Sequence, residues 1–124
     1  MANLKELLLH DNELQGTISS YIGDLGSIEK ISLNHNSFNG TIPTELGACN
    51  SLQELNLQRN SLTGGIPEQL GSLGNLVEMR LEKNNLKDAI MPGDLCVMVD
   101  ESKISHLSAD CRSKVTCDCC HECS

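Results

Sequence analysis

A 24-residue pattern of apolar residues repeats along most of this chain. It is clearest from Leu52 to Asn75, where apolar residues stand at offsets 0, 3, 5, 10, 14, 18 and 21 and Asn60 stands at offset 8. This spacing is neither that of an amphipathic helix nor the simple alternation of a strand. Matching copies start at Leu4, Ile28 and Leu76. Four copies in one register indicate a solenoid, in which each coil buries its apolar side chains against the next coil.

The first half of each copy predicts a short strand that ends at an asparagine. The Leu-x-Leu core alternates between inward and outward positions, as a strand does. Strands repeated in this way stack into a parallel sheet, with neighbours about 4.8 Å apart. The asparagine can bond backbone groups of its own coil and of the adjacent coil, which are otherwise buried without partners. The sequence therefore predicts a structural asparagine ladder, formed by Asn12, Asn36, Asn60 and Asn84.

The second half of each copy predicts a tight turn on the opposite side of the coil. Its motif Leu-x-Gly-x-Ile-Pro has a glycine suited to positive φ or close approach. Pro43 and Pro67 fix φ at the start of a helical turn that is too short for a stable α-helix. A 3-10 turn is expected instead. Gly23, Gly47 and Gly71 are expected to close these turns, as a glycine after a helix does.

The repeat Leu-x-x-Leu-x-Leu-x-x-Asn-x-Leu-x-Gly-x-Ile-Pro-x-x-Leu-Gly resembles the plant-type leucine-rich repeat of receptor-kinase ectodomains, polygalacturonase-inhibiting proteins and related secreted proteins. Three positions depart from the motif: Ser19 replaces proline, Asp88 replaces glycine, and Pro92 comes one place late. The resemblance implies an α/β solenoid, a right-handed superhelix with a concave parallel β-sheet and short 3-10 or helical turns on its convex side. Residues 1–95 are then four repeats without an N-terminal cap, and residues 96–124 a degenerate last coil with a cysteine-rich cap.

Six of the seven cysteines lie in the last 29 residues: Cys96, Cys111, Cys117, Cys119, Cys120 and Cys123. A disulfide-rich cap would cover the leucines of the final coil. Ile104, Leu107 and Ala109 continue the repeat spacing there as a degenerate fifth coil. A metal site is the alternative, but zinc ligands usually come as well-separated Cys-x₂₋₄-Cys pairs, so we expect disulfides and no metal. A reduced tail is a further alternative, and spacing does not settle the pairing.

The remaining cysteine, Cys49, stands where other copies have leucine and is expected to be a small buried apolar residue. The cysteine-rich tail is similar to the C-terminal cap of secreted leucine-rich-repeat proteins of diatom-type algae, which implies an extracellular or surface protein. Asn39, in Asn39-Gly40-Thr41, is a glycosylation candidate. The chain opens inside a coil without a signal peptide, so we expect a C-terminal piece of a longer protein, with a complete four-coil protein as the alternative.

Residues between the inward leucines of each strand are expected to face the concave surface, which is the natural binding face of a solenoid. Amide and mixed-charge side chains occupy these positions and suit hydrogen bonding to a peptide, a protein or a glycan. The predicted ligand-binding residues are Leu8, His10, Asn34, His35, Asn56, Gln58, Arg59, Arg80, Glu82 and Lys83. A solvated face without a ligand is the alternative.

Charge and motif content argue against several other functions. The net charge of −8 leaves no basic stripe for nucleic acid. No apolar run approaches the roughly 20 residues that span a bilayer, so no membrane insertion is expected within this chain. No hydrolase, phosphate-loop or zinc-protease motif is present. His10 and His35, with Asp11, offer an acid and a base, but an open face does not exclude water, and no enzyme activity is expected.

The sequence thus predicts a non-catalytic extracellular recognition module without a cofactor. Its partner is expected to be a protein or a peptide, with a glycan as a further possibility. Two alternatives stay open. One is a fragment of a leucine-rich-repeat receptor-like kinase ectodomain, and the other is an intracellular scaffold whose cysteines are reduced or bind metal.

Overall fold

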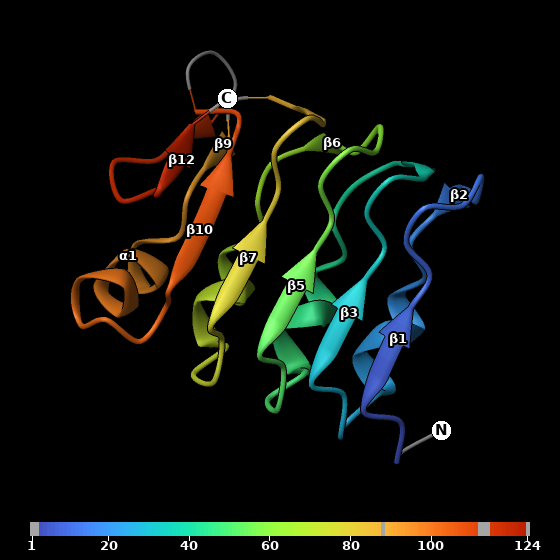
Figure 1. Cartoon of the computed structure of the whole chain (residues 1–124), viewed down its shortest axis with the longest axis horizontal. Coiled ribbons are helices and arrows are strands. Elements are labelled where there is room, and N and C mark those ends of the chain that lie inside the picture. The colour runs from blue at the N-terminus through green and yellow to red at the C-terminus, as the bar shows by residue number, and fades with distance from the viewer. Residues whose placement is uncertain (1–2, 88, 112–114, 124) are drawn as a thin grey trace.

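The computed structural model describes residues 3–87, 89–111 and 115–123. The chain winds as a solenoid, and one face is a six-stranded parallel sheet in the order β1-β3-β5-β7-β10-β12 (Figure 1). The strands are β1 (Glu6–Leu8), β3 (Lys30–Ser32), β5 (Glu54–Asn56), β7 (Glu78–Arg80), β10 (His106–Ala109) and β12 (Glu122–Cys123). The departure at Asp88 lies outside the described residues.

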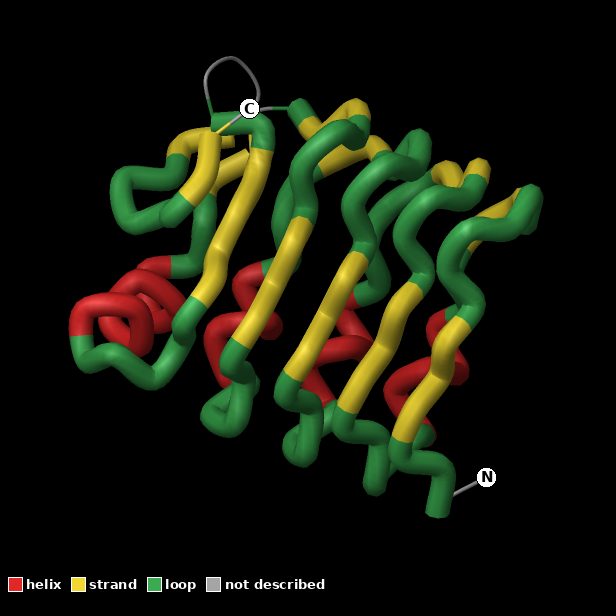
Figure 2. Tube along the Cα trace, in the orientation of Figure 1, coloured by secondary structure: helices red, strands yellow, loops and turns green. Residues whose placement is uncertain are grey.

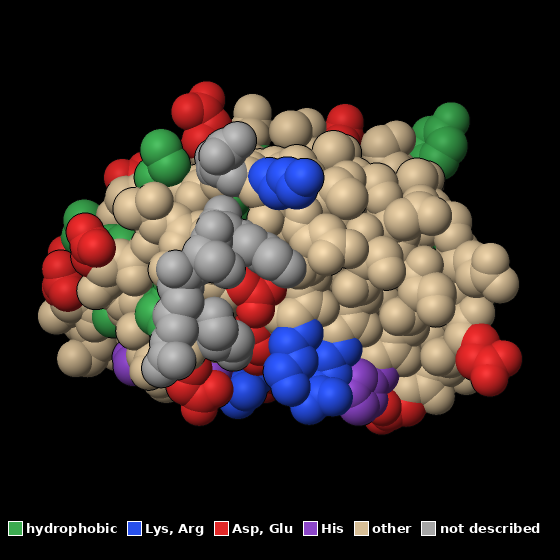
Figure 3. Space-filling model, turned by 90° about the horizontal axis from the view of Figure 1, so that it is seen from above, with side chains coloured by type: hydrophobic (Ala, Val, Ile, Leu, Met, Phe, Trp, Pro, Cys, Tyr) green, Lys and Arg blue, Asp and Glu red, His purple; other side chains and the backbone are tan. Residues whose placement is uncertain are grey.

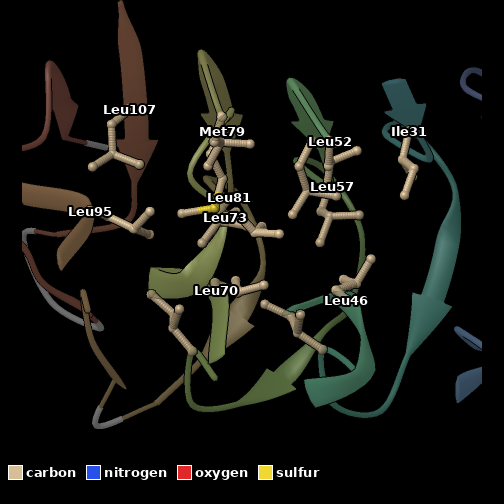
Figure 4. Packing of buried hydrophobic residues seen from close by; sticks show 14 of the residues in the cluster. Ile31, Leu46, Leu52, Leu57, Leu70, Leu73, Met79, Leu81, Leu95 and Leu107 are labelled. Carbon is tan, nitrogen blue, oxygen red and sulfur yellow. The ribbon is translucent and has the colours of Figure 1, made fainter. Parts of the chain in front are cut away.

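The middle residue of each strand points into the core and pairs in register with its counterparts. Leu7 pairs with Ile31, Ile31 with Leu55, Leu55 with Met79, and Met79 with Leu107. All except Leu7 are buried. They meet leucines from the turns behind the sheet, as Figure 4 shows. Because each buried aliphatic side chain contributes about 1.5–3 kcal/mol, stability arises coil by coil rather than from one central core.

Three 3-10 helices line the face behind the sheet (Figure 2). They are η1 (Ser20–Asp24), η2 (Thr44–Ala48) and η3 (Glu68–Ser72). Pro43 and Pro67 precede η2 and η3 with φ of −63° and −59°. Ser19 replaces the proline before η1, and its hydroxyl accepts a hydrogen bond from the Tyr21 N–H at 3.2 Å. The predicted solenoid with a parallel sheet and 3-10 turns is confirmed.

The expected role of Gly23, Gly47 and Gly71 is wrong. They lie inside the 3-10 helices, whereas the glycines with positive φ are Gly16, Gly40 and Gly64. A Cβ atom on Gly47 would lie 2.6 Å from the carbonyl oxygen of Gln69, and one on Gly23 would lie 2.7 Å from that of Glu45. These glycines therefore let consecutive 3-10 helices pack closely, rather than ending a helix.

Short pairs of parallel strands outside the six-stranded sheet were not predicted. They join β2 (Gln15–Thr17) to β4 (Ser37–Asn39), β6 (Thr63–Gly64) to β8 (Asn85–Leu86), and β9 (Ala89–Ile90) to β11 (Val115–Thr116). Each pair adds backbone hydrogen bonds between adjacent coils. The coils are thus tied together on two sides, which fixes how the sheet residues stand relative to one another.

The C-terminal region closes the array with a helix, three further strands and three disulfides. Helix α1 (Gly93–Asp100) packs beside η3, and β10 pairs with β7. The disulfides join Cys96 to Cys119, Cys111 to Cys123, and Cys117 to Cys120, with Cα–Cα distances of 5.4, 5.0 and 5.6 Å. The predicted disulfide-rich cap is confirmed. Within the described residues, no helix is long and apolar enough to cross a bilayer.

Candidate ligand-binding face

Asparagine side chains just after the strands hold neighbouring coils together, because each one makes hydrogen bonds to two coils. Asn60 donates to the carbonyl of Leu57 in its own coil at 3.2 Å and to that of Leu33 in the preceding coil at 2.9 Å. Its Oδ1 accepts from the N–H of Phe38 at 3.0 Å. Asn36 and Asn84 make the same set of contacts. These bonds satisfy backbone groups at the strand ends, so the side chains above them are held in fixed positions.

The ladder ends at a residue that the sequence analysis missed. The coil of Asn84 has no complete repeat after it, and the buried carboxylate of Asp110 takes the place of the next coil's backbone carbonyls. Its Oδ1 accepts from the N–H of Lys83 at 2.8 Å, and its Oδ2 accepts from the N–H of Asn84 at 3.0 Å. In earlier coils these N–H groups bond to backbone, as Asn36 N does to Arg59 O. Asp110 therefore terminates the array.

The outward residues of the sheet form two rows across its concave face. One row pairs Lys30, Glu54, Glu78 and His106 in register, and the other pairs Ser32, Asn56, Arg80 and Ser108. Depth varies along the rows: Asn56 is only 8% exposed, while Leu8 is 47% exposed. Of the other predicted residues, Asn34, Gln58, Arg80 and Glu82 are half-buried, and His10, His35, Arg59 and Lys83 are exposed. We call the buried and half-buried residues of this face its floor, and the exposed residues its rim.

A column at this rim has backbone in the left-handed region. Asp11, His35, Arg59 and Lys83 have φ between 57° and 60°. Non-glycine residues seldom adopt this conformation, yet every repeat does so here, so the turn after each strand requires it. Figure 3 shows lysine and arginine side chains gathered beside a histidine at one edge of the molecule. The rim is therefore more basic than the chain as a whole.

Ion pairs link neighbouring coils on this face. Lys30 Nζ lies 3.1 Å from Glu54 Oε2, and the hydrogen bond and charge of Glu54 raise the pKa of Lys30. His35 Nδ1 lies 2.5 Å from Asp11 Oδ1, so Asp11 pairs with the histidine of the next coil rather than with the adjacent His10. The His35 and Asp11 side chains are 46% and 60% exposed. Exposed pairs of this kind contribute about 0–1 kcal/mol.

The cap extends the concave face by two strands, and the sequence analysis missed its residues there. His106 and Ser108 lie on β10 beside Glu78 and Arg80, and the Ser108 hydroxyl donates to Glu82 Oε1 at 2.6 Å. The His106 ring stacks on that of His121, with centroids 5.9 Å apart. The signal was present, because Leu107 and Ala109 follow the repeat spacing and so place their alternate neighbours on the opposite face.

Comparisons with known proteins agree with this geometry. The sequence profile of the family described as Leucine rich repeat matches residues 2–62. The plant peptide hormone receptor RGFR1, solved in complex with RGF2, superposes with a TM-score of 0.78 and 33% identity over 85% of this chain. The fold is a leucine-rich-repeat solenoid. No curated protein gives a significant match.

Two further structures show the same leucine-rich-repeat architecture. The ectodomain of the Arabidopsis thaliana receptor kinase GASSHO1/SCHENGEN3 in complex with CASPARIAN STRIP INTEGRITY FACTOR 2 is 36% identical over 85% of this chain, with a TM-score of 0.74. The ectodomain of Arabidopsis thaliana SOBIR1 is 28% identical over 83% of this chain, with a TM-score of 0.73. This chain spans 16% of RGFR1, 12% of GASSHO1/SCHENGEN3 and 54% of SOBIR1.

Cys49 replaces a leucine in the interior of the leucine-rich repeats. It is fully buried and free, and its thiol donates to the carbonyl of Ile22 at 3.4 Å. Burial raises the pKa of the Cys49 thiol, because the interior disfavours the thiolate. Since the thiolate is the reactive form, Cys49 is a packing residue and not part of the concave face.

Proposed function

We propose that this chain is an extracellular recognition module that binds a peptide or a protein through its concave sheet. The observation that carries the proposal is the open face itself: six parallel strands present polar side chains at fixed spacing. The solved structures with this architecture include HAESA with the peptide hormone IDA and PEPR1 with AtPEP1. The proposed contact residues are the ten predicted from sequence, and their role is non-catalytic.

Three features support an extracellular location. Disulfides persist in oxidising compartments and are rare in the cytosol, and the cap holds three of them. Asn39 of the glycosylation sequon is exposed. The likeness of the tail to caps of secreted algal leucine-rich-repeat proteins points the same way. We treat residues 1–95 as the binding array and residues 96–124 as the cap.

A second candidate is a piece of a receptor-kinase ectodomain. The small share of RGFR1 that the chain spans favours it. In that case the concave face described above is one section of a longer surface. The two candidates use the same residues, so the same binding experiment tests both.

The test selects peptides against the folded chain and asks which face they use. Random twelve-residue peptides displayed on phage are the probe. We expect the selected peptides to bind Asn34→Trp about tenfold more weakly, because the indole covers the half-buried floor of the face. Ser72→Trp, at the exposed end of η3 behind the sheet, is the matched control and should bind as the parent does. Equal binding by both variants would contradict a concave site.

The location has its own test. The protein purified from its source cells is denatured without reduction, alkylated and weighed. One modified thiol, at Cys49, is the expected result for three cap disulfides in an oxidising compartment. Seven modified thiols would instead support the intracellular scaffold.

A further inference from the structure

Three buried side-chain atoms on the concave face have no hydrogen-bond partner. Among the described residues these are Asn56 Oδ1, Gln58 Oε1 and His106 Nε2. Buried polar groups are nearly always paired, and leaving one unpaired costs free energy. All three lie on one face of the sheet: Asn56 and Gln58 at the end of β5, and His106 on β10. A ligand that supplies their partners would remove this cost.

Asn56 is the deepest of the three. It lies between Ser32 and Arg80 in register on the sheet, and it is 8% exposed. Its amide nitrogen lies 3.5 Å from the Ser32 hydroxyl, which is long for a hydrogen bond. Gln58 follows two residues later and lies on the same face. Together the two amides present acceptor oxygens, and acceptors bind donors such as the N–H groups of an extended peptide.

The neighbouring strands carry an excess of negative charge. We call Glu78, Arg80, Glu82, His106 and Glu122 the junction cluster, because they lie where the repeats meet the cap. Three carboxylates and one guanidinium give it a net charge of −2 with neutral histidine. Arg80 lies 3.5 Å from Glu78, and its single positive charge offsets only one of the three carboxylates.

The contacts within the cluster leave acceptor capacity free for a ligand. Glu82 accepts one hydroxyl hydrogen bond, from Ser108, while a carboxylate has two oxygens. Glu122 is 64% exposed in its side chain, and its Oε2 lies 4.0 Å from His106 Nε2, too far for a hydrogen bond. Glu78 is 26% exposed and stands in register with His106. Carboxylates on both sides of one imidazole favour a cation at that point.

The distances fit a short stretch of peptide. Strands β5 and β10 lie two steps apart in the sheet, which corresponds to about 10 Å at the usual strand spacing. An extended chain covers that distance in about three residues. A peptide lying across the strands therefore reaches both the amide floor and the junction cluster.

We propose that the concave face binds an extended peptide with a basic side chain. The lysine or arginine head lies against Glu78 and Glu122 beside His106, and peptide N–H groups donate to Asn56 and Gln58. This inference rests on the proposed function and specifies its ligand. A glycan is a poorer match, because neutral hydroxyls leave the charge of the junction cluster unbalanced.

The experiment uses pools of acetylated, amidated octapeptides that share one fixed central residue and vary elsewhere. The fixed residue is arginine, lysine or citrulline, a neutral isostere of arginine. The pools are passed over the immobilised, oxidised chain. We expect the arginine and lysine pools to bind about tenfold more tightly than the citrulline pool, as charge-assisted hydrogen bonds imply.

A charge-matched pair of variants locates the effect. Glu78→Gln with Glu122→Gln removes two charges from the junction cluster, and the preference for a basic residue should fall to about twofold or less. Glu45→Gln with Glu68→Gln removes two charges from η2 and η3 behind the sheet, and the preference should persist.

The outcomes separate the two proposals. Equal binding of arginine and citrulline pools, weakened by Asn34→Trp, would overturn the basic-residue inference and leave the concave site standing. A basic preference that both double variants retain would show general attraction to an acidic protein and would also overturn the inference. If no pool binds at all, both the basic-residue inference and the proposed function are overturned.

Discussion

The two ends of the solenoid are finished in different ways. At the C-terminal end, α1, β10 and β12 cover the last coil, and three disulfides hold them together. At the other end, β1 has an unpaired edge within the described residues, and apolar side chains face outward. Leu9 is 38% exposed and Tyr21 is 79% exposed. A mainly apolar cavity of about 250 Å³ opens there, lined by residues that include Leu7, Leu33 and Phe38.

Hydrogen bonding shows the same contrast. Among the described residues, the Asn12 side chain donates to the carbonyls of Leu9 and His10, both in its own coil. At the far end, the carboxylate of Asp110 supplies acceptors to the last full coil. An interior coil obtains partners from both neighbours, so a terminal coil needs a substitute for the missing one. The C-terminal cap is such a substitute. Changes in the cap should therefore lower the free energy of unfolding more than changes at the N-terminal end do.

Reduction of the disulfides should produce the largest effect. Each closes a loop, with sequence separations of 23, 12 and 3 residues, and contributes about 2–3 kcal/mol. Because domains are stable by only about 5–15 kcal/mol, we expect the reduced cap to open. Hydrogen exchange with and without a reducing agent should show amide protection lost in β10 and kept in β3 and β5.

A Cys49→Ala variant is the control for that experiment, since it removes the free thiol and leaves the three disulfides. It should exchange like the parent chain, both before and after reduction. Unchanged protection of β10 in the reduced protein would mean that packing of α1 alone holds the cap.

Asp110→Ala should be the next largest change. It removes two charge-assisted hydrogen bonds and leaves two backbone N–H groups without their acceptor, which we expect to cost about 3 kcal/mol. Asp110→Asn should fall in between, because an amide keeps one acceptor oxygen. Urea unfolding measures both. Asp100→Ala, at the exposed end of α1, should stay within about 0.5 kcal/mol of the parent, and an equal loss at both sites would refute the terminating role.

A pair of asparagine variants compares an interior coil with the open end. Asn60→Ala removes bonds to two coils, whereas Asn12→Ala removes exposed bonds within one coil. We expect losses of about 2 kcal/mol and less than about 1 kcal/mol. Thermal unfolding of the two variants measures the difference. Equal losses would show that Asn60 gains nothing from bonding the preceding coil.

The repeat made most of this architecture predictable from sequence. Residues at equal offsets must face the same way, so one reading of the Leu52 coil assigned the strand, the turn and the inward side chains of every other coil. The sheet and the 3-10 turns are confirmed on that basis. The disulfide cap, predicted instead from the six clustered cysteines, is confirmed as well. The glycines at the 3-10 helices were misread, because spacing does not show whether Gly47 is needed for its φ or for the neighbour that packs on it.

The site was less predictable, because spacing assigns a face but no depth. Asn56 and Lys83 both lie on the predicted face, yet one is buried and the other is exposed. The difference depends on side chains in adjacent coils. Asp110 follows Asn84 by 26 residues rather than 24, so the repeat register conceals its role. His106 was passed over for a different reason: the spacing of Leu107 and Ala109 marked its coil, but the binding residues were predicted from the four full repeats alone.

The smallest effect on stability, and the most direct test of the open end, comes from Leu9→Lys combined with Tyr21→Lys. Apolar surface beside an unpaired strand edge favours association, so we expect the parent chain to self-associate and the double variant to do so about tenfold less tightly. Sedimentation velocity measures both.

Val97→Lys makes the same kind of change at an exposed residue of α1 and should leave association unaltered. Association should stop at a dimer joined through the two open ends, because such pairing leaves neither open end exposed. A parent chain that stays monomeric up to about 1 mM would show that the exposed first coil is tolerated without a partner.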